Sequence, residues 1–460
     1  MFSYLLCLLL IPSSIAQQSG GDASGCKYAG VNIAGFDFGC ITDGTCTLGS
    51  VSPPLGGGSG QGDGAAQMQH FVTQDKFNVF RLPVGWQYLV DSPGGTLNQN
   101  FATYDKLVQA CIAAKANCII DIHNYARWNG AIIGQGGPSN EDFAGLWGQI
   151  AKKYAASSAV WYGLVNEPHE VPDMGAWAKT CQDAVNAIRQ SGGTGKILLP
   201  GNVYTAAGAF VSSGSAAALA TVTDPSGGTE NLIFDFHNYF DSDNSGTHAD
   251  CTTNKITDGF TPPLDFLRQN KRQALVSELG GGGSSASCLT MICEALDFLN
   301  TNSDVYLGWV AWAAGSFPND YVLQVEQGGQ DTQLMSQCFA GKFGGGPAGG
   351  GGGITAVGGG AVGGSTNGTE SPGAGAGGAG GGTTQPLSFL QTGSSSGSGN
   401  VTDTGAGGGT GTGTGAGAAT SGGAQSKCNG KRRRKRHVAA GQNIKRGGKA
   451  RIHLQEGKLV

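Results

Sequence analysis

The chain has 460 residues, 83 of them glycine, and a formal net charge of −4 that is unevenly divided along its length. Residues 344–426 hold 34 glycines but only one aromatic residue and two charges, so this segment cannot bury enough apolar surface to offset its ordering entropy. Residues 427–460 carry 12 basic residues and one acidic residue, whereas residues 1–426 carry 16 basic and 31 acidic residues, which argues against nucleic acid as a partner of the body.

The amino-terminal residues 1–16 predict a secretory signal. Their apolar run ends in Ser14-Ile15-Ala16, which places small residues at the two positions that a signal peptidase inspects. The run is shorter than the roughly 20 apolar residues of a membrane helix, and no other segment qualifies, so we expect a secreted protein without a transmembrane segment. Ten cysteines follow in the body, where export makes disulfides the default. None of them forms the paired C-x-x-C spacing of a zinc ribbon, so no metal is expected.

The body, residues 26–343, shows repeated strand and helix patterns. Eight apolar or alternating segments are predicted strands, at residues 28–36, 77–84, 118–123, 160–166, 197–202, 232–239, 274–278 and 306–313. Helical patterns between them include residues 104–115, 143–154, 174–189 and 289–299. Eight such units in about 320 residues favour an α/β fold of the closed (β/α)₈ barrel type, the TIM barrel. A doubly wound open sheet is the alternative, but no glycine fingerprint follows the first strand.

Polar or aromatic side chains stand where six predicted strands end: Arg81 in FRLPV; Asp121, His123 and Asn124 in DIHNY; Asn166 and Glu167 in LVNEPH; His237 and Tyr239 in DFHNY; Glu278 in VSELG; and Trp309 and Trp312 in WVAWAAG. In a barrel the carboxyl-terminal ends of all strands meet on one face, where such enzymes carry out their chemistry. Polar groups there are expensive to desolvate unless they serve one another. The pattern therefore predicts a single functional site on that face.

The chemistry of this site is best explained by its two glutamates. Glu167 and Glu278 can flank one bond, and glycoside hydrolysis needs such a pair, one protonated and one ionised. Asn166 can hydrogen-bond a sugar hydroxyl, and Arg81 can keep a neighbouring carboxylate ionised. A metal site at His123 and His237 lacks the H-E-x-x-H pattern and a third ligand, and no G-x-S-x-G elbow supports serine catalysis. No cofactor is expected.

Six of the seven tryptophans divide into two predicted groups. Trp86, Trp128 and Trp312, together with Tyr239, lie near the polar strand ends and can offer flat faces to sugar rings. Trp147, Trp161 and Trp177 lie inside helices or strands and are predicted to pack in the core.

The segments AGVNIAGFDFG, FRLPVGW, DIHNYARWNG, GLVNEPH, DFHNYFD, SELGGG and GWVAWAAGSF resemble secreted fungal endo-β-1,4-glucanases of glycoside hydrolase family 5, and the resemblance covers essentially all of residues 26–343. The resemblance implies a (β/α)₈ barrel and retaining hydrolysis of cellulose-type β-glucan, with Glu167 as acid/base and Glu278 as nucleophile. It implies supporting roles around the cleaved sugar for Arg81, His123, Asn166, His237 and Tyr239, and an aromatic platform at Trp312. It also implies the disulfides Cys40–Cys46, Cys111–Cys118, Cys251–Cys288 and Cys293–Cys338, which leave Cys26 and Cys181 over. A monomer is expected.

The chain also departs from that family. Residues 427–460 contain no aromatic residue and one cysteine, so they do not resemble the cellulose-binding module that many members carry. A β-mannanase or a xyloglucan-active hydrolase remains an alternative, because one barrel and glutamate pair serve several β-linked glycans. A non-catalytic cell-wall protein is a further alternative, but such a protein would be free to lose Glu167 or Glu278, and both are present.

The segment beyond residue 343 leaves several interpretations open. Both N-glycosylation sequons of the spacer, at Asn367 and Asn400, fall in its Ser/Thr-rich part, which indicates a glycosylated, flexible stalk. The run KRRRKR at residues 431–436 is consistent with attraction to anionic wall polymers, a dibasic processing site or an artefact of gene prediction. We favour processing or artefact over tethering.

Overall fold

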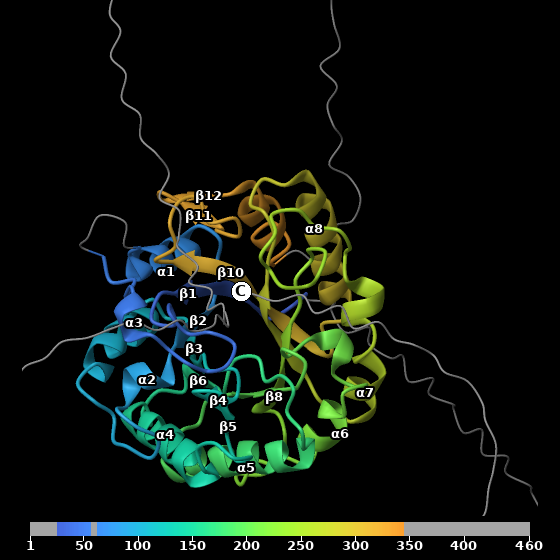
Figure 1. Cartoon of the computed structure of the whole chain (residues 1–460). Helices are drawn as coiled ribbons and strands as arrows, with labels where there is room; N and C mark the ends of the chain where they lie inside the picture. The colour runs from blue at the N-terminus through green and yellow to red at the C-terminus, as the bar shows by residue number, and fades with distance from the viewer. Residues whose placement is uncertain (1–24, 57–61, 345–460) are drawn as a thin grey trace, which may run out of the picture. The chain divides into compact units, whose positions relative to one another are not determined.

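The computed structural model describes residues 25–56 and 62–344 as a closed barrel of eight parallel strands (Figure 1). The order around the barrel is β1-β10-β9-β8-β7-β6-β3-β2, which confirms the predicted (β/α)₈ architecture. The barrel strands are β1 Tyr28–Ala34, β2 Val79–Val84, β3 Asn117–Ile122, β6 Val160–Gly163, β7 Ile197–Pro200, β8 Leu232–His237, β9 Ala274–Leu279 and β10 Tyr306–Gly315. The predicted signal, the spacer after Gly344 with its sequons, and the basic tail lie outside the described residues.

Helices surround the barrel in the view of Figure 1. They are α1 Gly64–Thr73, α2 Trp86–Leu89, α3 Phe101–Ala113, α4 Asn140–Lys153, α5 Met174–Gln190, α6 Ser215–Leu219, α7 Leu264–Gln269 and α8 Ala286–Thr301. Two short hairpins accompany them, β4 Arg127–Trp128 with β5 Ala131–Ile132, and β11 Glu326–Gln327 with β12 Gln330–Asp331. All eight predicted strands and all four predicted helices are present, with ends that shift by a few residues. Within the described ranges, no helix is long and apolar enough to cross a membrane.

Helix α4 shows how local sequence sets these elements. Ser139 caps its first turn by accepting from the backbone N–H of Asp142, whose carboxylate accepts in return from the backbone of Ser139. Acidic residues in the first turn and Lys152 and Lys153 in the last complement the helix dipole. The buried face repeats at helical spacing, so the helix packs one apolar stripe on the barrel.

The barrel interior contains two layers that differ in polarity. The lower layer is an apolar cluster of side chains that point inward from the strands: Val79, Ile119, Trp161, Leu198, Ile233, Leu275, Leu307 and Val310. Because side chains alternate along a strand, residues two positions further on face the same interior. Four of those residues are polar, Arg81, Asp121, Asp235 and Ser277, and all four are buried. The polar layer therefore rests on the apolar one.

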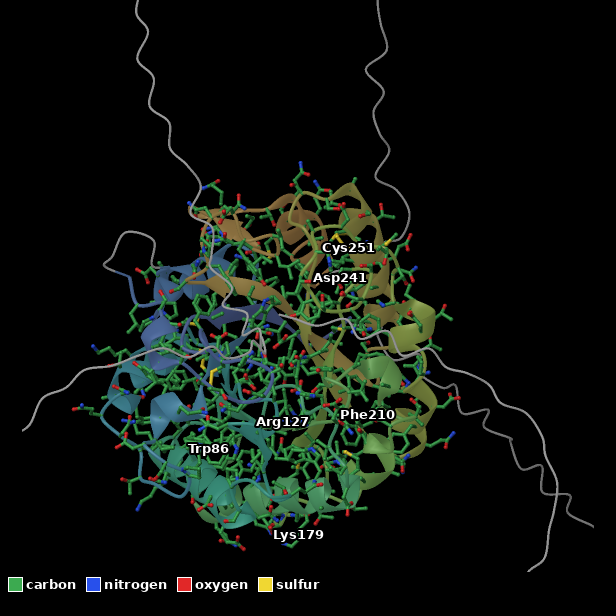
Figure 2. All side chains as sticks on the ribbon, in the orientation of Figure 1. Trp86, Arg127, Lys179, Phe210, Asp241 and Cys251 are labelled. Carbon is green, nitrogen blue, oxygen red and sulfur yellow. A yellow bond between two sulfur atoms is a disulfide. The ribbon has the colours of Figure 1, made fainter. Side chains whose placement is uncertain are left out.

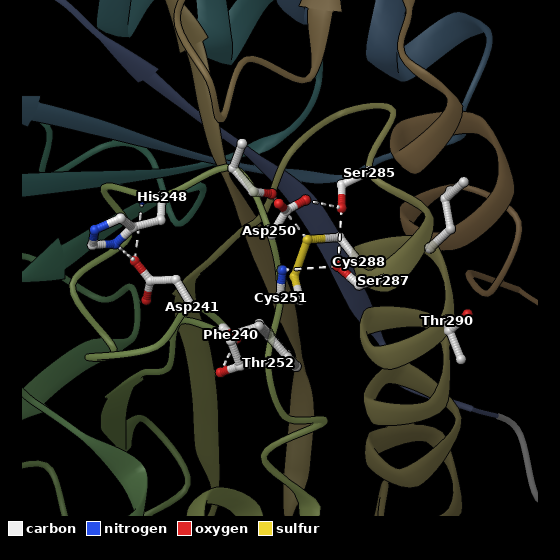
Figure 3. The surroundings of a disulfide bond; sticks show 12 residues. Phe240, Asp241, His248, Asp250, Cys251, Thr252, Ser285, Ser287, Cys288 and Thr290 are labelled. Carbon is white, nitrogen blue, oxygen red and sulfur yellow. Dashed lines mark hydrogen bonds and ion pairs between the residues drawn. A yellow bond between two sulfur atoms is a disulfide. The ribbon is translucent and has the colours of Figure 1, made fainter.

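Four disulfides stabilise the described chain, and they are the four that the family resemblance implies: Cys40–Cys46, Cys111–Cys118, Cys251–Cys288 and Cys293–Cys338. Figure 3 shows Cys251–Cys288, which ties the segment after β8 to α8. Cys26 and Cys181 are free thiols, both buried. Burial raises the pKa of Cys26 to about 12, which keeps that thiol protonated and unreactive.

One prediction about the tryptophans is wrong. Trp86 is fully buried, with its ring edge-on to Trp128 at 5.2 Å and close to Phe143, so it has no face to offer a ligand. It begins the short helix α2 directly after β2, and the β4–β5 hairpin that carries Trp128 packs against it. The predicted core positions Trp147, Trp161 and Trp177 are buried as expected.

Trp177→Ala should lower the free energy of unfolding by about 3–5 kcal/mol, because the indole is fully buried and its Nε1–H donates to the carbonyl of Pro200 at 3.0 Å. Lys179, two residues along α5, extends from the edge of the molecule (Figure 2), and Lys179→Ala should change stability by less than about 0.5 kcal/mol. Urea unfolding followed by far-ultraviolet circular dichroism compares the two variants. Equal losses would contradict the packing described.

Candidate active site

Two carboxylates meet at the carboxyl-terminal end of the barrel. Glu278 lies near the end of β9 and its side chain is 4% exposed, whereas Glu167, in the segment after β6, is 16% exposed. Carboxylate oxygens of the two residues come within 4.8 Å of each other. The two predicted glutamates thus share one site, with Glu167 the more accessible.

A bulge in β9 places the side chain of Glu278 in the barrel interior. Phe236 of β8 pairs with Val276, but His237 pairs with Glu278, so Ser277 is an extra residue in β9. The pairing of β9 with β10 shifts at the same place. Bulges of this kind re-aim side chains near active sites. Here the bulge brings both Ser277 and Glu278 to the interior, where a regular strand would bring only one of them.

The guanidinium of Arg81 holds the polar layer together. Nη1 donates to Glu278 Oε1 and, at 2.9 Å, to Oδ1 of Asn32. Nη2 donates to Oδ1 of Asn166 at 2.7 Å and lies 3.0 Å from Oδ2 of Asp121. Arg81 is fully buried, and this fork gives Glu278 a fixed orientation.

The surroundings of Glu278 favour its ionised form. Burial alone would raise the pKa of this carboxyl, but the positive charges of His237, Arg81 and His123 outweigh burial and bring the pKa below its ordinary value. The hydroxyl of Tyr239 donates to Oε2 at 2.7 Å and acts in the same direction. Glu278 is therefore held as a carboxylate with a fixed set of hydrogen-bond donors.

His237 connects the two glutamates. Its Nδ1 lies 2.7 Å from Oε1 of Glu167 and 3.5 Å from Oε2 of Glu278. Burial would lower the pKa of His237, but the two carboxylates outweigh burial and raise it. Glu167 itself has a left-handed backbone conformation, with φ of 42°. Such conformations are rare for residues with side chains and cluster at functional sites.

His123 and Trp312 complete the predicted site. Nδ1 of His123 lies 2.9 Å from Oδ2 of Asp121, the carboxylate that also contacts Arg81. The rings of His123 and Trp312 lie nearly parallel, with centroids 5.8 Å apart. The indole of Trp312 donates to the hydroxyl of Tyr321 at 2.9 Å and is 9% exposed. Contacts thus connect all eight predicted site residues into one continuous group.

Several polar residues of the site were missed from the sequence. Asn32 of β1, which donates to the carbonyl of Ser277, and the Asp235–Ser277 pair lie within apolar strands. A signal for Asp235 was present, because D-x-H-N-Y occurs twice, once in β3 and once in β8. Tyr204 was also missed. It is 43% exposed and stacks on His169 with centroids 4.4 Å apart, two residues beyond Glu167.

Metal-binding potential differs among the clusters of the described residues. His70, Asp75 and Asp331 form one candidate group, and Asp241, Asp243 and His248 form another, in which His248 contacts Asp241 (Figure 3). At the barrel end, both oxygens of Glu278 already accept hydrogen bonds, from Arg81 and Tyr239. Glu167, His237 and Glu278 form the third candidate group, in which Glu278 thus already has partners among the protein's own side chains.

Comparisons with known proteins find a matching family and several similar structures. Residues 40–315 match the family model "Cellulase (glycosyl hydrolase family 5)". The endoglucanase EG-II of Hypocrea jecorina is 56% identical over 331 residues, which cover 70% of this chain and 79% of that protein. The crystal structure of Cel5A (EG2) from Hypocrea jecorina aligns with a TM-score of 0.67 at 56% identity, over 69% of this chain and 99% of the other. A structure of XacCel5A in complex with cellopentaose aligns with a TM-score of 0.60 at 30% identity, over 69% and 98%.

Tyr239→Phe should raise the pKa of Glu278, because the lost hydroxyl donates to the ionised carboxylate and stabilises it. Carbon-13 NMR of the labelled Glu278 carboxyl, titrated in both proteins, measures this change. Tyr88→Phe is the matched control, since Tyr88 lies in α2 and makes no contact with the site. A Glu278 pKa that stays the same or falls in Tyr239→Phe would contradict the role given to this hydroxyl.

Proposed function

The chain belongs to the cellulase family of glycosyl hydrolases, family 5, and from this premise we propose how its site works. The protein is an endo-β-1,4-glucanase that hydrolyses internal bonds of cellulose chains. Glu278 is the nucleophile, Glu167 is the acid/base, and the products retain the β-configuration. The observation that carries these roles is the pairing of a buried carboxylate, held ionised by His237 and Arg81, with a more accessible carboxylate beside it.

The separation of the glutamates supports retention. Retaining glycosidases place their two carboxyls about 5–5.5 Å apart, whereas inverting enzymes leave about 6.5–9.5 Å for a water molecule. Oxygens of Glu167 and Glu278 come within 4.8 Å, which favours direct attack by Glu278 on the sugar. A covalent glycosyl-enzyme forms, and water then hydrolyses it.

The two half-reactions give each residue a separate task. In the first, Glu278 attacks the anomeric carbon while Glu167 donates its proton to the leaving oxygen. In the second, Glu167 accepts a proton from the incoming water. Arg81 and Tyr239 hold Glu278 in one orientation for both steps. His237 contacts Glu167, and the charge on its ring compensates for the change in charge when Glu167 loses or gains a proton.

Two aromatic side chains in contact with residues near the glutamates support a polysaccharide as substrate. Trp312 lies beside His123 and is proposed to support the sugar that is attacked. Tyr204 presents an exposed ring near Glu167 and is proposed to support the sugar that leaves. His123 and Asn166 can bind hydroxyl groups of the two sugars that Trp312 and Tyr204 support.

We also propose that the protein acts outside the cell. Its four disulfides form and persist in oxidising compartments. Residues 1–16, the proposed signal, can be tested by the intact mass of the secreted protein, which should begin near Gln17.

Alanine variants of the two glutamates should respond differently to added azide. Glu278→Ala removes the nucleophile, so activity should collapse and azide should yield an α-glycosyl azide. Glu167→Ala should lose about 10²–10⁴-fold with poor leaving groups but still form the glycosyl-enzyme from activated aryl cellobiosides. Product analysis by proton NMR separates these outcomes and identifies the first-formed anomer. Identical responses of the two variants, or initial release of the α-anomer from the wild type, would refute the assigned roles.

Reducing-sugar release from carboxymethyl cellulose, glucomannan, xyloglucan and xylan, measured side by side, tests the substrate. The fastest release is expected from carboxymethyl cellulose. Faster release from a mannan or from xyloglucan would instead favour one of the related hydrolases with the same barrel.

A further inference from the structure

A buried pair of side chains lies behind His237, on the side away from Glu167. Asp235 is 2% exposed and Ser277 is fully buried. The Ser277 hydroxyl donates to Oδ1 of Asp235 at 2.5 Å, and its oxygen lies 3.1 Å from Nε2 of His237. The other ring nitrogen, Nδ1, lies 2.7 Å from Glu167. Asp235, Ser277, His237 and Glu167 thus form one continuous chain.

The single hydroxyl proton of Ser277 fixes the direction of hydrogen bonding along this chain. Because Ser277 donates that proton to Asp235, its oxygen can only accept from His237. Nε2 of His237 must then carry a proton, and Nδ1 faces Glu167 with no proton of its own when the ring is neutral. A bare Nδ1 and an ionised Glu167 repel each other at this distance, so one proton is retained between them.

We propose that Asp235 and Ser277 are positioning residues that hold a proton on Nε2 of His237 and thereby keep the proton shared by His237 and Glu167 in place. This inference rests on the proposed role of Glu167 as acid. Neither Asp235 nor Ser277 contacts Glu167, so both act through His237. Without them, the neutral ring can place its proton on Nδ1 instead, where it stabilises an ionised Glu167 that can no longer donate.

The charges around the chain favour this arrangement. Asp235 faces Arg81 of β2, Asp121 of β3 and His237 of its own strand. Burial raises the pKa of Asp235 to about 6, against the opposing effects of His237 and Arg81, so the carboxylate is ionised at neutral pH. His237 faces Glu278 of β9 and Glu167 after β6.

The related motif in β3 lacks this connection. There, Asp121 contacts Nδ1 of His123 directly at 2.9 Å, with no serine between them. In β8 the bulged Ser277 of the neighbouring strand reaches Nε2 of His237 instead, which leaves Nδ1 free to face Glu167. The same D-x-H sequence therefore uses different ring nitrogens in the two strands. In β3 the histidine contacts its aspartate through Nδ1, whereas in β8 the histidine contacts the serine through Nε2.

Nitrogen-15 NMR of His237 tests the proposal without relying on activity. At a pH above the ring's pKa, the wild type should show the proton on Nε2. Ser277→Ala and Asp235→Asn should both shift it towards Nδ1. Asp224→Asn is the control, since Asp224 is also a buried carboxylate but pairs with Arg189. A wild-type proton on Nδ1, or unchanged spectra in both variants, would overturn the proposal.

Kinetics provide the second measurement. In both variants the basic limb of the kcat/KM profile should move to lower pH, with roughly tenfold loss on that limb and little change at the optimum. The loss should be larger for phenyl than for dinitrophenyl cellobioside, because only the former needs the proton. A uniform loss at every pH and with every leaving group would show that the pair has only a structural role. The azide test of the glutamates is independent, so failure of either idea can be recognised separately.

Discussion

The guanidinium of Arg81 places a full positive charge in the middle of the barrel, and the polar layer is arranged around that charge. A buried charge without partners would be very costly, so carboxylates and amides from several strands must face it. Asn32 of β1, Asp121 of β3, Glu278 of β9 and Asn166 after β6 supply those partners. The planar fork of arginine also fixes the angles at which they approach. Arg81 thus joins groups from four parts of the barrel, and together with His237 it favours the ionised state of Glu278.

The two interior layers have different roles: the lower layer contributes to stability, and the upper layer holds the groups of the site. The lower apolar layer contributes burial without polar groups that need partners. The layer above it contains charged groups that stabilise one another only when all of them are present, because removing one leaves its buried partners unpaired. This arrangement lets an expensive polar cluster exist inside a protein whose remaining strand side chains are packed between barrel and helices.

Sequence patterns predicted the strands and the residues at their ends because burial and alternation are local properties. Glu167, Glu278 and Arg81 could be recognised since they interrupt apolar runs at the expected end of a strand. Ser277 could not, because a serine hydroxyl within a strand gives no local signal of its partner, and that partner, Asp235, comes from another strand. Trp86 was misassigned for a related reason, since proximity to a strand end does not reveal that a hairpin covers the ring.

The bulge in β9 has a consequence for how this strand can change during evolution. Ser277 and Glu278 are neighbours in the chain, yet both serve the interior through one irregular stretch of backbone. Loss of a single residue there would restore regular pairing and turn one of the two side chains outwards. A point substitution leaves the number of residues unchanged. A one-residue deletion or insertion would move the side chains that follow it to the opposite face of the strand. Change in this segment is therefore restricted to replacements that preserve its length.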